Sequence, residues 1–307
     1  MELTSLHPTG AEKRVGMSLN QKLLKQLIRQ SLAEDIGSGD ITTRYSVNPS
    51  LRARGVIIAK EDMVVCGLEI VKLVFKEYDR SLRFKAACSE GAWVRKGKIV
   101  AEIQGKVISI LPAERTALNF LSFLSGIATK TYRFVQVTKG YKVKILDTRK
   151  TIPTWRILQK YAVRVGGGGN HRWGLWDGII LKENHLTSLG IKHKKGGFQE
   201  TILRNLISNL KKATAKKIEV EAENLGEFLS IARCQPDIIL LDNFTLSNIK
   251  KAVQLRNQYF KSIKLEASGR INIKNIRKVA AAGVDFISSG SLTHSFSSCD
   301  VSLELIV

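Results

Sequence analysis

The stretch KIEVEAENLGEFLSIARCQPDIILLDN, residues 217–243, decides the fold class of this chain. Residues 217–223 alternate between charged and apolar side chains and predict a strand. Residues 225–232 have the apolar spacing of a helix, and residues 237–242 contain a second, continuous apolar strand. Two strands joined by a helix at this distance predict a βαβ unit, in which the strands run parallel.

The same alternation continues on both sides of this stretch. Further strands are predicted at 142–147, 178–182, 263–267 and 284–290. Further helices are predicted at 154–163, 199–211, 246–259 and 273–281. The second half of the chain is therefore expected to form an α/β domain around a parallel sheet.

Polar residues at the strand ends indicate whether this sheet is open or closed. Nearly every predicted strand ends in side chains that could take part in chemistry: Asp147, Lys182, Glu221, Asp242, Glu266 to Ser268 and Ser288 to Gly290. A barrel enzyme builds its site at the carboxyl ends of several strands, whereas an open doubly wound sheet concentrates such residues at one switch point. The pattern favours a barrel.

The first half of the chain has a different pattern of predicted helices and strands. An amphipathic helix with Ser18 as its N-cap is followed by short β-rich runs at 53–59, 82–86, 99–103 and 107–110. Pro112 then suits the first turn of a long helix. That helix start would place Arg115 in the first turn, where the helix dipole disfavours a cation. We expect an α+β domain with a small sheet.

Composition limits the functional classes. The 307 residues carry 49 Lys+Arg against 27 Asp+Glu, a formal charge of +22. Three explanations are open for this charge: nucleic-acid binding, a site for polyanionic small substrates, and a bias toward solvated lysines. No nucleic-acid-reading motif accompanies the basic residues. The bias is the preferred explanation.

The cysteines and the N-terminus bear on location. The four cysteines are scattered, which predicts free thiols in a cytoplasmic chain. The sequence has no apolar run of membrane-spanning length and no signal-like N-terminus, so we expect no membrane contact.

Four cations are expected to meet at one rim of the barrel. Arg149 and Lys150 follow one predicted strand, Arg172 follows the glycine run 166–169, and Lys182 ends the next strand. Left unpaired, these charges would repel one another, so we interpret them as a cradle for an anionic ligand. The neighbouring His171 is ambiguous by itself.

An acidic strand face suggests a cation site. Glu219, Glu221 and Glu223 lie two residues apart and therefore share one face of a strand. With Asp242 at the end of a neighbouring strand, they suggest a Mg²⁺ site; ion pairs with the rim cations are the alternative. Turns after two late strands, at 266–270 and 287–291, suit phosphate binding. The residues alone thus indicate a phosphorylated, magnesium-bound substrate meeting an anionic partner.

Several motifs resemble the quinolinate phosphoribosyltransferase family, also called carboxylating nicotinate-nucleotide pyrophosphorylases. The matching segments lie in order from about residue 18 to the C-terminus: 34–42, 114–119, 125–129, 147–151, 166–175, 182–185, 219–221, 241–243, 266–269 and 283–285. One departure is Arg164-Val165 before the glycines, where many members have a small residue or cysteine; we expect it to be harmless.

The resemblance implies the reaction of quinolinate with phosphoribosyl pyrophosphate and Mg²⁺, giving nicotinate mononucleotide, pyrophosphate and CO₂ in NAD biosynthesis. It implies an N-terminal α/β sandwich, residues 18–117 joined by the tail 295–307, and an incomplete barrel over 118–294; residues 1–17 are an extension. It also implies a homodimer with shared active sites; further assembly, for example into a hexamer, stays open.

The resemblance also implies residue roles. Lys150, Glu221 and Asp242 would be catalytic, with Glu221 and Asp242 holding Mg²⁺ and the ribose. The quinolinate carboxylates would bind Arg149, His171, Arg172 and Lys182, with Arg115 reaching in from the partner subunit. The remaining substrate contacts would be Thr148 and, for phosphate, Ser268, Gly269 and Gly290. Two alternatives are a paralogue acting on another anionic base, such as a molybdenum-transport-associated relative, and a basic nucleic-acid-binding protein.

Overall fold

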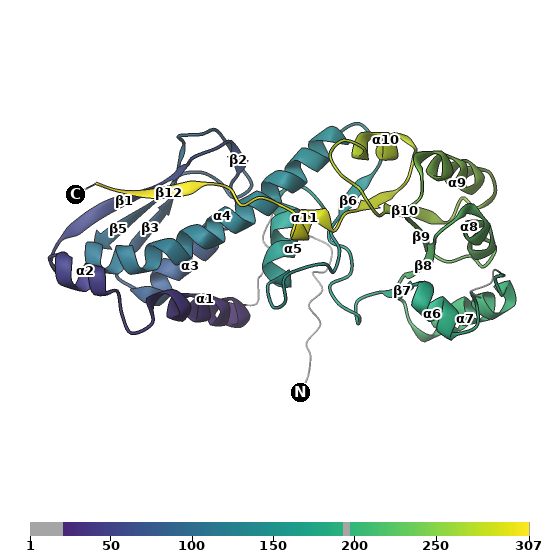
Figure 1. Ribbon diagram of the computed structural model, residues 1–307, viewed down its shortest axis with the longest axis horizontal. Helices are drawn as coiled ribbons and strands as arrows, with labels where there is room; N and C mark the ends of the chain where they lie inside the picture. Colours follow the sequence, from purple (N-terminus) through teal and green to yellow (C-terminus); the bar gives the residue numbers. More distant parts are fainter. Residues whose placement is uncertain (1–20, 193–196, 307) are drawn as a thin grey trace. The chain divides into compact units, whose positions relative to one another are not determined.

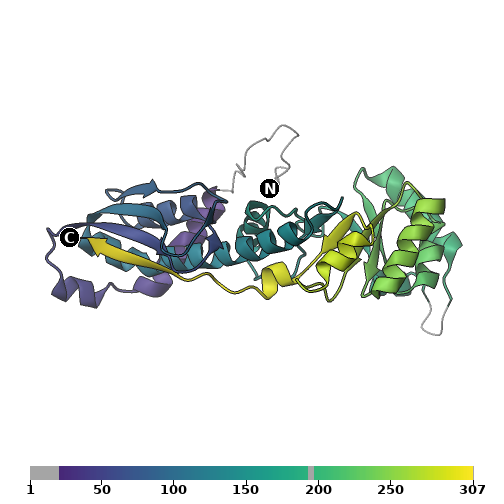
Figure 2. The same ribbon diagram turned by 90° about the horizontal axis from the view of Figure 1, so that it is seen from above.

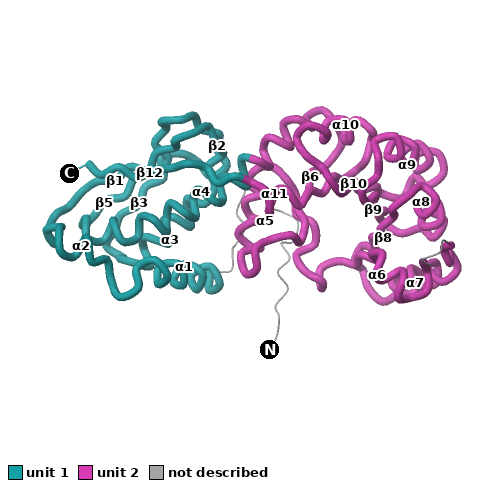
Figure 3. The backbone as a smooth tube through the Cα atoms, viewed as in Figure 1, with its two compact units in different colours: residues 1–129, 297–307 teal, residues 130–296 magenta. Residues whose placement is uncertain are grey.

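The computed structural model describes residues 21–192 and 197–306, and the chain forms two compact units (Figure 3). Unit 1 comprises residues 1–129 and 297–307, and unit 2 comprises residues 130–296. The chain passes from unit 1 to unit 2 within the long helix α4, Val107–Val137. The N-cap predicted at Ser18 lies outside the described residues.

Unit 1 is built on an antiparallel sheet with the strand order β12-β1-β5-β3. The last strand of the chain pairs with the first, as Figure 2 shows for the yellow C-terminal strand. The elements of unit 1 are α1 (Gln21–Ile36), α2 (Ile41–Ser46), β1 (Arg52–Ala59), β2 (Met63–Val64), α3 (Leu68–Tyr78), β3 (Arg83–Ala86), β4 (Trp93–Val94), β5 (Ile99–Lys106), the first part of α4, and β12 (Val301–Ile306). Ile57, Phe75 and Ile103 are fully buried and form part of its core.

The predicted strand over residues 107–110 is wrong, because these residues form the first turn of α4. The N–H of Val107 still bonds to the carbonyl of Leu51, as in the preceding strand, and the helix begins at that residue. A short apolar run has no periodicity that separates a buried strand from a buried helix. Pro112 consequently lies inside the helix, and Arg115 lies beyond its first turn, so the dipole argument for Arg115 does not hold.

The sequence interpretation also missed α3. Its buried residues Leu68, Val71 and Phe75 have helical spacing, and Gly67 precedes them with a positive φ of 110°. The spacing i, i+3, i+7 was the signal that could have identified the helix.

The helix α4 has the length and hydropathy of a membrane span, but 61% of its most apolar window is buried inside the protein. Two of its buried side chains bind the backbone of unit 1: Thr129 Oγ1 accepts from the N–H of Val64 at 2.8 Å, and Ser125 Oγ accepts from the N–H of Cys66 at 3.0 Å. Such contacts are those of a core helix in a globular domain.

Unit 2 is an incomplete α/β barrel, as predicted (Figure 1). Its parallel sheet has the order β6-β11-β10-β9-β8-β7, so the first strand pairs with the last, as in a barrel, while β6 and β7 do not pair. Its elements are β6 (Lys144–Leu146), α5 (Arg156–Val165), β7 (Ile179–Leu181), α6 (Glu183–Ser188), α7 (Glu200–Ala213), β8 (Ile218–Ala222), α8 (Leu225–Ala232), β9 (Ile238–Asp242), α9 (Leu246–Tyr259), β10 (Lys264–Ser268), α10 (Ile276–Ala281), β11 (Phe286–Ser288) and α11 (Ser291–His294).

The barrel helices bury their apolar stripes against the strands. Phe228 and Ile231 of α8 and Ala252 of α9 are fully buried, as are the strand residues Ile239 and Leu265. All of the predicted strands of this unit form, and α9 has the predicted bounds. This arrangement brings the carboxyl ends of the strands to one end of the barrel.

Candidate functional site

A cavity of about 760 Å³ opens at the carboxyl ends of the barrel strands. It is lined by every barrel residue to which the resemblance assigns a role: Thr148, Arg149, Lys150, His171, Arg172, Lys182, Glu221, Asp242, Ser268, Gly269 and Gly290. Arg115 is the exception, since it is an exposed residue of α4 in unit 1. The pattern of polar strand ends therefore did locate a common site.

Two arginines supply buried donors to this cavity. Nε of Arg149 and Nε of Arg172 are buried and have no hydrogen-bond partner among the described residues. Arg172 Nη1 donates to the carbonyl of Gly178 at 2.9 Å, which fixes the guanidinium plane. Burial and the nearby charge of Arg149 lower the pKa of Arg172. Buried donors without acceptors are costly, so the cavity suits an anion that accepts from both.

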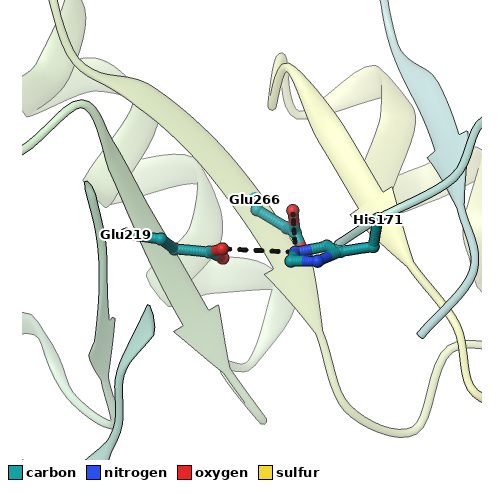
Figure 4. Close-up of side chains that lie close together, drawn as sticks. All are labelled: His171, Glu219 and Glu266. Carbon is teal, nitrogen blue, oxygen red and sulfur yellow. Dashed lines mark ion pairs between the residues drawn. The ribbon is translucent and has the colours of Figure 1, made fainter. Parts of the chain in front are cut away.

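His171 is clamped by two acidic residues from the barrel interior. Its Nε2 lies 3.2 Å from Glu219 of β8 and 3.4 Å from Glu266 of β10 (Figure 4). Burial opposes the charge on the ring, but hydrogen bonds to Glu219 and Glu266 outweigh it and raise the pKa of His171 to about 10.

A second contact of His171 favours the neutral ring, because Nδ1 accepts from the backbone N–H of Arg172 at 2.8 Å. Both charge states keep a proton on Nε2 between the two carboxylates. His171, Glu219 and Glu266 could geometrically hold a metal ion. The Nε2 proton already bridges the carboxylates, so we interpret the cluster as a clamp on the ring.

The acidic residues of β8 and Glu223, which directly follows it, each pair with a different basic side chain. Glu219 pairs with His171, Glu221 pairs with Lys182, and Glu223 pairs with Lys192 at 2.6 Å. Ion pairs were the alternative to a metal site, and they form here. Of these carboxylates, only Glu221 lines the cavity together with Asp242.

Glu221 and Asp242 nevertheless form an acidic pair within the cavity. Burial raises the pKa of Asp242, and the charge of Glu221 raises it further. A cation bound between the two side chains would relieve this repulsion. Carboxylate oxygens of this kind are the ligands that Mg²⁺ takes in proteins.

The opposite wall is made by the turns after β10 and β11. Gly269 has a φ of 87°, and a Cβ there would lie 2.2 Å from Oδ1 of Asn243. A Cβ on Gly290 would lie 2.9 Å from Cδ of Lys150 and 3.0 Å from the His294 ring. Glycine is therefore required at 269, whereas at 290 a Cβ would displace the side chain of Lys150 or His294.

Some functional positions were not found from the sequence. Asn243, Arg270 and His294 also line the cavity. Asn243 and Arg270 directly follow predicted site residues, which was the available signal.

Asp147, which we grouped with the chemical strand ends, is instead fully buried against Lys160 and absent from the cavity wall. Its carboxylate instead accepts from Lys160 Nζ, from Asn170 Nδ2 and from the backbone N–H of His171.

Comparison with known proteins adds a consistent picture. The family model for the N-terminal domain of quinolinate phosphoribosyl transferase matches residues 40–125, and the model for the C-terminal domain matches residues 127–304. A probable carboxylating nicotinate-nucleotide pyrophosphorylase of Methanocaldococcus jannaschii is 39% identical over 288 residues, covering 92% of this chain and 96% of that protein. The corresponding enzyme of Mycobacterium leprae is 36% identical, with coverages of 92% and 96%.

Solved structures agree with these sequence relatives. The nicotinate-nucleotide pyrophosphorylase of Francisella tularensis superposes with a TM-score of 0.84 at 37% identity, over 96% of this chain and all of that one. Human nicotinic acid phosphoribosyltransferase superposes at 0.59 over 93% of this chain and 74% of its own, with 12% identity, which shows a shared fold alone.

Proposed function

Because this chain belongs to the quinolinate phosphoribosyltransferase family, we propose how its cavity performs that family's reaction. Its activity is that of a carboxylating nicotinate-nucleotide pyrophosphorylase in NAD biosynthesis. It joins quinolinate to phosphoribosyl pyrophosphate and forms nicotinate mononucleotide, pyrophosphate and CO₂. In our proposal, the two substrates occupy opposite parts of the cavity in unit 2.

Quinolinate binds at the cationic part. The observation that carries this assignment is the pair of buried Nε donors on Arg149 and Arg172, which lack protein acceptors in the described chain. A pyridine with two adjacent carboxylates supplies acceptors for both guanidinium groups. Lys182 adds a third cation, and the clamped ring of His171 forms part of the same wall.

Phosphoribosyl pyrophosphate binds toward β10 and β11. Thr148 and the small residues Ser268, Gly269 and Gly290 leave room and hydrogen-bonding groups for phosphate oxygens. Lys150 packs over Gly290. We propose that its ammonium group acts near the reacting centre.

The residues of the cavity can assist each stage of this reaction. Departure of pyrophosphate develops positive charge at the anomeric carbon of the ribose, and Glu221 and Asp242 stabilise that charge. The cationic cradle aligns the ring nitrogen with the same carbon. After the carbon–nitrogen bond forms, the ring accepts electrons, the adjacent carboxylate leaves as CO₂, and the ring carbon takes up a proton.

We also propose that Glu221 and Asp242 hold Mg²⁺ together with substrate oxygens. The raised pKa of Asp242, caused by burial and by the charge of Glu221, supports this placement. When bound, the ion would neutralise charge on the pyrophosphate leaving group.

The cationic site should discriminate strongly between pyridine acids. Quinolinate should give nicotinate mononucleotide, whereas nicotinate should react roughly 100-fold less efficiently or worse, because it leaves buried donors unpaired. Product formation is followed with Mg²⁺ and phosphoribosyl pyrophosphate, with a reaction lacking any base as the control. Equal turnover of the two acids would rule out the decarboxylating assignment.

Removal of Glu221 or Asp242 should impair the use of phosphoribosyl pyrophosphate and not the binding of quinolinate. Glu221→Ala and Asp242→Ala should each reduce kcat/KM for phosphoribosyl pyrophosphate by roughly 100-fold, while quinolinate binding is largely retained. Calorimetry of each substrate and the Mg²⁺ dependence of turnover measure the two effects. Glu223→Ala, which removes an exposed carboxylate just beyond the same strand, is the matched control. Unchanged metal dependence in both variants would leave the pair with a structural role.

The quaternary structure belongs to the same proposal. We propose a homodimer in which Arg115 of each subunit completes the cavity of the other, as the family resemblance implies; Arg115 is exposed and does not line the cavity described here. A cytoplasmic location is also proposed. All four cysteines are free thiols, and burial raises the pKa of Cys66, which keeps that thiol protonated.

A further inference from the structure

An ion pair lies entirely inside unit 2, beneath the cationic part of the cavity. The ammonium group of Lys160, on α5, contacts the carboxylate of Asp147, which follows β6. Both side chains have an exposed fraction of 0%. Neither residue lines the cavity, and the proposed function does not use either of them.

Stability does not explain this pair. Transfer of two charges from water into a protein interior costs more than their attraction commonly returns, and apolar replacements of such pairs are often neutral or stabilising. Burial disfavours the charged form of both partners, since it raises the pKa of Asp147 and lowers the pKa of Lys160. A further role is therefore expected for the pair.

The pair ties together the segments that carry the two arginines. Oδ1 of Asp147 accepts from the backbone N–H of His171 at 2.9 Å, and Oδ2 accepts from Nδ2 of Asn170 at 2.6 Å. Asn170 Nδ2 also donates to the carbonyl of Lys160 at 2.9 Å. Lys160 Nζ in turn donates to the carbonyl of His171 at 3.0 Å.

These contacts fix one arginine relative to the other. Arg149 lies two residues after Asp147, and Arg172 directly follows His171. The ammonium of Lys160 also lies 5.5 Å from the ring centre of Trp173, so the chain is held on both sides of Arg172. The buried Nε donors of the two arginines are thus carried by backbone that converges on one buried pair.

We propose that Lys160 and Asp147 are positioning residues that set the spacing of Arg149 and Arg172 and so determine recognition of the two adjacent carboxylates of quinolinate; this inference rests on the proposed function. Two guanidinium groups match two carboxylates only at a defined separation. A small displacement of either arginine therefore weakens the binding of a rigid dicarboxylate. Binding of phosphoribosyl pyrophosphate depends less on this spacing, because Ser268, Gly269 and Gly290 lie on the turns after β10 and β11.

The test is the double variant Lys160→Met/Asp147→Asn, which removes both charges and so buries no unpaired ion. It should fold with a Tm close to that of the wild type, because the desolvation cost disappears along with the attraction. Its KM for quinolinate should rise about tenfold or more, by analogy with the loss seen when hydrogen-bond partners of metal ligands are replaced. Its KM for phosphoribosyl pyrophosphate should change less than about threefold.

A second buried pair supplies the matched control. Arg256 of α9 and Asp285 are 10% and 20% exposed, lie 2.6 Å apart and belong to the same unit, but neither lines the cavity. Arg256→Met/Asp285→Asn should leave the ratio of the quinolinate KM to the phosphoribosyl pyrophosphate KM the same as in the wild type. Asn170→Ala removes the two hydrogen bonds that Asn170 donates to Asp147 and to the carbonyl of Lys160, and it removes no charge. It should also raise the quinolinate KM selectively. This variant decides the question if the double variant does not fold.

The outcomes separate the inference from the function on which it rests. Wild-type protein that forms no nicotinate mononucleotide from quinolinate overturns both. An active wild type, together with a folded double variant whose quinolinate KM is unchanged, overturns the positioning role alone. A folded double variant in which both substrate KM values rise together also overturns the positioning role, because general loosening of the barrel would have that effect.

Discussion

Arg172→Lys is expected to raise the KM for quinolinate about 10- to 100-fold while largely preserving the fold and the use of phosphoribosyl pyrophosphate. The guanidinium group of Arg172 does two things at once. Nη1 donates to the carbonyl of Gly178 at 2.9 Å, and the buried Nε is left for a ligand. A lysine keeps the charge but presents one ammonium group on a flexible stem, so it cannot both hold that carbonyl and present an oriented donor.

Steady-state kinetics with each substrate varied in turn measure this effect, and calorimetry of quinolinate binding checks that KM follows affinity. Arg233→Lys is the control, since Arg233 pairs with Glu200 at 2.8 Å and does not line the cavity. Wild-type quinolinate KM in Arg172→Lys would show that Arg172 is not a carboxylate ligand.

Mixed dimers of two inactive variants should recover about a quarter of the wild-type activity. Arg115→Ala removes the residue that we assign to the partner's cavity, and Lys182→Ala removes a residue of the subunit's own cavity. Refolding equal amounts together should give about half mixed dimers by random pairing. In each mixed dimer, one cavity has both residues intact and the other has neither.

The two parent variants, each refolded alone, are the controls and should stay inactive. Mass spectrometry of the intact dimers confirms that mixing occurred. If Arg115 served its own subunit, every cavity in the mixed dimer would keep one lesion and no activity would return. Confirmed mixed dimers without recovery would therefore exclude the shared site.

The net charge of +22 did not help to identify the activity. The useful charges were Arg149, Lys150, Arg172 and Lys182, and their positions relative to strands and glycines distinguished them from the other cations. Charge at defined strand ends carries information about a site because parallel strands bring those ends together.

The sequence by itself determined the barrel and the residues at its rim. Each strand near the site, such as 238–242, is a local apolar pattern with polar residues at its end, and local periodicity is visible in one dimension. Since β6 to β11 run parallel, these ends had to meet, and the cavity is lined by the residues they carry.

Only the tertiary structure decided which of these residues pair with one another. The strand β8 predicted an acidic face, but the division of its carboxylates between His171 and Lys182 depends on segments distant in the sequence. Contacts with distant segments also explain why residues 107–110 form a helix and not the predicted strand. They likewise explain the burial of Lys160 against Asp147. A four-residue apolar run or a single lysine has no local signal for its state, because its free energy is set by the groups that surround it after folding.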